Sequence, residues 1–127
     1  FGVGCAGANG AIRLQSYVPP RIGTTFPFRA VRSVGVGAPF TAMLAASWQG
    51  QRQGVDLGGF GMPGCSWWIQ GGQTLLVGPS QQGFDVRIPS LPALVDTTFY
   101  LQALAADPGA NAAGLISSPA FEVVVGL

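Results

Sequence analysis

The stretch Phe-Asp-Val-Arg-Ile at residues 84–88 alternates apolar and charged side chains without interruption. Successive side chains of a strand point to opposite faces, so this alternation is typical of a strand with one face buried and the other in water. An amphipathic helix would instead repeat its apolar residues three and four positions apart. The stretch therefore predicts a half-buried strand and favours an all-β protein.

Several other short stretches have the same period of two or are apolar on both faces. Turns rich in glycine and proline separate them, and the chain holds 20 Gly and 10 Pro. Strands are expected at residues 12–15, 25–30, 40–48, 65–70, 74–77, 84–88, 97–105 and 121–127, with a short one near 55–57. About eight short strands predict one antiparallel β-sandwich domain over residues 1–127, with a small closed β-barrel as the alternative.

Three of these segments allow a more specific prediction. The stretch 40–48 is apolar on both faces, which predicts a central strand. Pro27 lacks a backbone N–H, so its strand should lie at a sheet edge or contain a bulge. Residues 50–64 are rich in glycine and read as a connection between strands.

The chemistry available to the chain is narrow. It has no His, its six basic residues are all Arg, and only 9% of its residues are charged. General acid–base catalysis and metal binding rely on titratable or coordinating side chains, so we expect no enzyme activity, cofactor or metal. The net charge of +1 gives no basic surface for nucleic acid. No apolar stretch approaches the roughly 20 residues of a membrane-spanning helix.

The few carboxylates do not form a convincing site. A glycosidase would need a pair of them, but Asp85 and Glu122 are expected on outer strand faces, and Asp96 and Asp107 in turns. Residues 107–111 (DPGAN) offer too few oxygen ligands for calcium. We read these positions as ordinary turn and surface residues.

Cys5 and Cys65 are the only cysteines. They are too few for a metal site without His, so a disulfide is their simplest use, and two free buried thiols are the alternative. The chain also begins without a Met or a basic-then-apolar leader, as expected after removal of a signal peptide. An extracellular or cell-surface location follows from both observations.

Five short motifs occur in a fixed order: GVGCAG (2–7), PGC (63–65), FYLQA (99–103), DPGAN (107–111) and VG (125–126). Together they resemble a domain type at the C-terminal end of many secreted proteins of planctomycetes and similar bacteria. The chain departs from that pattern at Asp96, where Gly is more common, and at the unusual pair Trp67-Trp68. The resemblance implies an exported β domain with its two cysteines paired, and it brings no catalytic or binding residues.

The aromatic residues suggest one binding hypothesis. Trp48, Trp67, Trp68, Tyr17 and Tyr100 could stack against sugar rings, as exposed aromatic side chains do in carbohydrate-binding modules. Trp67 and Trp68 are adjacent, so in a strand they point to opposite faces and at most one belongs to the core. They are therefore the predicted ligand-stacking residues for a polysaccharide partner.

The low charge suggests a second hypothesis, self-association. Lysine usually protects sheet edges from pairing with other chains, and this chain has none. The last stretch is apolar apart from Glu122, and the predicted assembly residues are Phe121, Val123, Val125 and Leu127. This strand could complete its own sandwich or add to the sheet of a neighbouring subunit.

The sequence thus predicts a secreted structural protein that self-assembles as a homo-oligomer or polymer, as the subunit of a filament or surface layer. The alternative is a carbohydrate-binding or adhesive module of a cell-surface protein.

Overall fold

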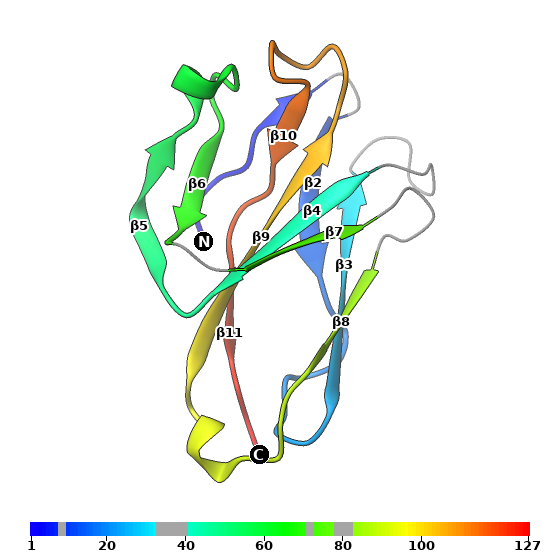
Figure 1. Ribbon diagram of the computed structural model, residues 1–127, viewed down its shortest axis with the longest axis vertical. Coiled ribbons are helices and arrows are strands. Elements are labelled where there is room, and N and C mark those ends of the chain that lie inside the picture. The colour runs from blue at the N-terminus through cyan, green and yellow to red at the C-terminus, as the bar shows by residue number, and fades with distance from the viewer. Residues whose placement is uncertain (8–9, 33–40, 71–72, 78–82) are drawn as a thin grey trace.

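The computed structural model describes residues 1–7, 10–32, 41–70, 73–77 and 83–127. Its regular structure is β-strand apart from two short 3-10 turns, η1 (Gly58–Phe60) and η2 (Pro92–Leu94). Two antiparallel sheets face each other across one apolar core, and a separate two-stranded hairpin lies beside them (Figure 1). The predicted β-sandwich is confirmed, and the described strands do not close into a barrel.

The first sheet has the order β1-β2-β3-β8. Its strands are β1 (Ala6–Gly7), β2 (Gly10–Gln15), β3 (Thr25–Arg32) and β8 (Gly83–Arg87). The alternation at residues 84–88 has the predicted outcome, because Ile88 is buried while Asp85 and Arg87 are exposed. Ile12 and Leu14 of β2 likewise face the core.

Pro27 lies on β3, which is an interior strand of this sheet rather than an edge strand. It is nevertheless tolerated, because β2 pairs with β3 only from Arg29 onward. On one side Pro27 pairs with Asp85 of β8. On the other side its carbonyl accepts a hydrogen bond from the Ser16 hydroxyl. The proline therefore occupies a part of β3 that lacks one neighbouring strand.

The second sheet is built around β4 (Ala42–Ser47) and β9 (Thr98–Ala106). β7 (Gln73–Val77) pairs with β4, and β10 (Leu115–Ser117) and β11 (Phe121–Val124) follow one another along the far edge of β9. The predicted central strand is confirmed as β4, although Phe40, its expected first residue, lies outside the described residues. The odd-numbered residues of β9 from 99 to 105 face the core.

The hairpin corrects the prediction for residues 50–64. Instead of a connection with a short strand near 55–57, the chain forms β5 (Gly50–Asp56), which pairs with β6 (Ser66–Ile69). The pairing shifts register between Gly50 and Val55, where Gly54 has a φ of +63°. A glycine at such a bulge weakens the alternating pattern, so tertiary pairing and not local sequence produces this strand.

Candidate functional site

Cys5 and Cys65 form a disulfide with their Cα atoms 4.9 Å apart, which confirms the predicted use of the two cysteines. The bond joins the N-terminal segment to the residue that precedes β6, the second strand of the hairpin. The segment also runs beside β10, where the Cys5 amide donates to the Ser117 carbonyl at 3.0 Å. A disulfide fits a protein of an oxidising compartment.

Gln102 anchors the hairpin through β6, close to the disulfide, and its role was not foreseen from the sequence. Its side chain is fully buried on the outer face of β9. Its Oε1 accepts from the Trp68 amide at 2.8 Å, and its Nε2 donates to the carbonyls of Ser66 and Ser118 at 2.9 Å each. The signal available in the sequence was one amide side chain in the middle of a mostly apolar strand, because a buried polar side chain must find partners.

We call the contact between the hairpin, the N-terminal segment and β9 the hairpin seam, and Trp68 packs within it. The indole Nε1 donates to the Val3 carbonyl at 3.0 Å, and the ring meets Phe1 edge-on with centroids 6.3 Å apart. Gly2 and Gly54 lie so close to the ring that neither position has room for a Cβ. Trp68 therefore contributes to holding the hairpin in place.

Of the other aromatic residues of the binding hypothesis, Tyr100 shares with Trp68 a contact to Phe1, whereas Tyr17 and Trp48 belong to other parts of the structure. Trp67, the neighbour of Trp68 on β6, is half-buried. Tyr100 meets Phe1 edge-on with centroids 5.7 Å apart, whereas Tyr17 is 84% exposed in the loop after β2. Trp48, at the end of β4, is 63% exposed and meets Phe99 edge-on at 6.0 Å. The structure thus does not gather the aromatic set into one cluster.

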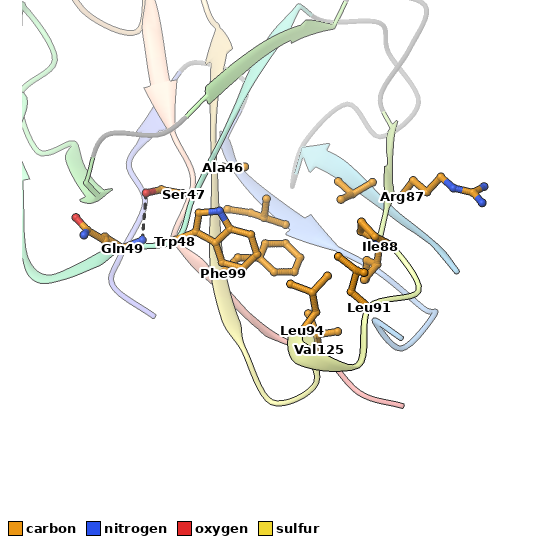
Figure 2. A pocket seen from close by; sticks show the side chains of 13 residues that line it. Ala46, Ser47, Trp48, Gln49, Arg87, Ile88, Leu91, Leu94, Phe99 and Val125 are labelled. Carbon is orange, nitrogen blue, oxygen red and sulfur yellow. Dashed lines mark hydrogen bonds between the residues drawn. The ribbon is translucent and has the colours of Figure 1, made fainter. Parts of the chain in front are cut away.

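Trp48 borders an open groove of about 640 Å³ between the two sheets. In Figure 2, Trp48 and Phe99 lie on one side of the groove and face Ile88, Leu91 and Leu94 across it. The second sheet contributes residues 46–49, Phe99, Leu101 and Val125, and β8 with the η2 region contributes residues 86–89, Leu91 and Leu94. Such a volume lies within the range of ligand-binding sites.

The groove reaches into the core of the sandwich. Ile88, Phe99, Leu101 and Val125 line it although each is at most 8% exposed. Leu91, at its mouth, is 55% exposed. The polar groups that accompany this apolar lining are Ser47, Gln49 and the exposed Arg87. The groove can therefore bind an apolar or aromatic group, with few directional contacts to select it.

The predicted assembly strand completes its own sandwich, which was one of the two uses weighed from the sequence. Val123 and Val125 are 2% exposed in the core, and Phe121 packs against that core. Beyond β11 the Val125 amide donates to the Thr97 carbonyl at 2.9 Å, and the Gly126 amide donates to the Pro20 carbonyl at 2.8 Å. Of the four predicted residues, Leu127 is the one that is strongly exposed, at 83%.

The carboxylates do not converge in the described part of the chain. Asp56, Asp85, Asp96 and Glu122 are exposed, while Asp107 is buried at the end of β9. No group of three or more His, Cys, Asp or Glu residues that could hold a metal ion occurs within the described ranges. The groove is therefore the strongest candidate site.

Comparison of the chain with protein-family models, with curated proteins and with solved structures finds no match. Within the ranges the structure describes, no helix has the length and apolar character to cross a membrane.

Proposed function

We propose that this protein is an extracellular structural subunit that self-assembles into a filament or surface layer and carries out no catalysis. One observation carries the proposal: the groove exposes an apolar opening that leads to core residues of the sandwich. A concave and mostly apolar surface of this kind is a common setting for a binding site. A partner that fills the groove would remove that surface from water, which is the main favourable term in association.

The rest of the surface supports a second copy as the partner. Large apolar side chains are also exposed outside the groove lining, among them Val3 at 67% and Phe60 at 74%. With 9% charged residues, the chain has little charge repulsion to keep copies apart. Each copy thus offers both an apolar opening and apolar side chains that could enter one.

Particle size of the purified protein tests this proposal. Negative-stain electron microscopy and light scattering should show filaments or sheets that grow with protein concentration. Assemblies held by apolar contacts should persist at 0.5 M salt, where exposed ion pairs are screened. A 13.0 kDa monomer at every concentration would refute self-assembly.

Carbohydrate binding is the second candidate, and the exposure of Trp48 favours it. Its indole lies at the groove mouth beside the polar side chains of Ser47 and Gln49, a combination suited to stacking and hydrogen bonding with a sugar ring. Trp67 and Trp68 remain the residues that the sequence proposed for stacking. Pull-down on insoluble polysaccharide with Trp48→Ala, Trp67→Ala and Trp68→Ala shows which of the three tryptophans the binding requires. Absence of binding by the wild type would exclude this function.

A further inference from the structure

Strand β8 ends the first sheet, and among the described strands it pairs with β3 alone (Figure 1). In an antiparallel strand, successive residues direct their backbone N–H and C=O groups to alternate sides. Ile88 directs both groups toward the β3 side, because its amide donates to the Thr24 carbonyl and its carbonyl accepts from the Gly23 amide, each at 2.9 Å. The alternation then directs the backbone groups of Asp85 and Arg87 to the outer edge of the sheet.

Pro27 gives the same assignment independently. It is opposite Asp85 in the pairing of β3 with β8. Its carbonyl accepts a hydrogen bond from the Ser16 hydroxyl, on the side away from β8. Pro27 and Asp85 therefore form a non-hydrogen-bonded pair, in which the backbone groups of Asp85 point away from β3. An edge with its N–H and C=O groups directed outward is a template for pairing with another strand.

The side chains of this edge carry two opposite charges. Asp85 and Arg87 are both exposed, and as alternate residues of one strand they lie on the same face. On β3 the positions directly opposite them are Pro27 and Thr25, so neither charge faces an opposite charge there. Opposite charges directly across two antiparallel strands stabilise the pair, and like charges destabilise it. A strand that fits this edge should therefore place a cation opposite Asp85 and an anion opposite Arg87.

A second copy of β8 meets both requirements in one register. When two β8 strands run antiparallel with Val86 opposite Val86, Asp85 of each copy lies opposite Arg87 of the other. These are the residues whose backbone groups point outward, so each Asp85–Arg87 pair exchanges two backbone hydrogen bonds. A shift of one strand by two residues keeps the hydrogen bonds but places Asp85 opposite Asp85 or Arg87 opposite Arg87. The charges thus favour the register that is symmetric about Val86.

We propose that two copies of this protein pair antiparallel through β8, with Asp85 of each copy opposite Arg87 of the other, and so join their first sheets into one continuous sheet. On the inner face the half-buried Val86 side chains meet and lose apolar surface to water. The contact is isologous and closes on itself, so it produces a dimer, and a filament or layer then needs a second contact. This inference rests on the proposed function of self-assembly and names its partner and first contact.

Charge reversal tests the contact and its register. Arg87→Asp creates two pairs of negative charges across the contact, and Asp85→Arg creates two pairs of positive charges. Each variant alone should need an about tenfold higher protein concentration than the wild type to leave the monomer at low salt. A 1:1 mixture of the two should associate nearly as the wild type does, because opposite charges face each other again. The double variant Asp85→Arg with Arg87→Asp should do the same. Sedimentation velocity measures the monomer fraction in each case.

Arg13→Asp is the matched control. It makes the same charge reversal at an exposed residue of β2, an interior strand of the same sheet. It should associate like the wild type. The differences among all variants should shrink at 0.5 M salt, because exposed charges are screened there.

The outcomes separate this contact from self-assembly in general. A wild type that is monomeric at every concentration would overturn both proposals. A wild type that forms a dimer and nothing larger, with the expected response to charge reversal, would support this contact and overturn the filament or layer. Assemblies that are unaffected by Arg87→Asp and Asp85→Arg would overturn this contact and leave self-assembly standing. Two weakened variants that do not associate when mixed would overturn the proposed register.

Discussion

The second sheet is covered by the chain itself at the hairpin seam and is left uncovered at the groove. At the seam, the chain covers the outer face of β9 with its own hairpin, and a disulfide, the Gln102 hydrogen bonds and the Trp68 packing hold it there. At the groove, the core-facing side of the sheet near Trp48 and Phe99 is left open, and its lining is mostly apolar. The seam shows internal covering with satisfied polar groups, whereas the groove keeps a mostly apolar lining that nothing in the described structure covers.

Loss of the disulfide should be the largest disruption of the seam. The bond closes a loop with a sequence separation of 60 residues, and chain entropy gives about 4 kcal/mol of stabilisation for a loop of that size. We expect Cys5→Ser with Cys65→Ser to lower the free energy of unfolding by about that amount. Urea denaturation of this variant beside the oxidised and reduced wild type measures it. Equal stability of all three would show that the other seam contacts suffice.

Gln102→Leu should have the next largest effect. It leaves the Trp68 amide and the carbonyls of Ser66 and Ser118 without this partner in a buried place. Unsatisfied buried groups cost about 1–3 kcal/mol each, and we expect a total loss of about 3 kcal/mol after local relaxation. Thermal unfolding measures the loss, and Gln53→Leu on the exposed part of β5 is the control with little effect. If Gln102→Leu left the stability unchanged, apolar packing alone would be sufficient to hold the hairpin.

Substitutions of Trp68 and Trp48 compare the seam and the groove directly. Trp68→Ser removes a ring packed against Gly2, Gly54 and Phe1, and should cost about 2–3 kcal/mol, the lower part of the range for large-to-small substitutions. Trp48→Ser loses mainly the edge contact with Phe99 and should cost less than about 1 kcal/mol.

For assembly, the substitution with the smaller cost in stability should have the larger effect. Trp48→Ser should abolish filaments in a protein that is still folded. Chemical denaturation together with light scattering measures both quantities on each variant. Equal destabilisation by the two substitutions would remove the distinction between seam and groove.

Asp96 should give the smallest effect, at the groove end of the molecule. It is the one described non-glycine residue with positive φ, at +66°, and its amide donates to the Val125 carbonyl at 2.8 Å. Asp tolerates this left-handed conformation better than Ala does, so Asp96→Ala should cost about 1 kcal/mol. The free energy of unfolding of Asp96→Gly should stay within about 0.5 kcal/mol of that of the wild type. Glycine relieves the backbone strain of the folded state, but it also gives the unfolded chain more conformational freedom, and the two effects offset each other. Melting temperatures of both variants test this, and a Gly variant less stable than Ala would contradict it.

The all-β class, the central position of β4 and the half-buried strand at 84–88 could be predicted because they depend on local side-chain alternation, which the backbone geometry of a strand imposes. The disulfide could be predicted because two cysteines leave one pairing. Strand β6 lies within the predicted strand at 65–70, but most of β5 and the whole of β10 were missed. Glycine-rich or very short strands have little pattern of their own and form by pairing with partners distant in sequence.

The sequence by itself determined that this chain has few charged side chains, no His and many apolar side chains to bury. Only the tertiary structure decided which of those side chains are buried internally. It placed Val123 and Val125 in the protein's own core, packed Trp68 into the seam and left Trp48 beside an open groove. The reason is physical: strand alternation assigns a side chain to a face, but which neighbour covers that face depends on contacts between residues far apart in the chain.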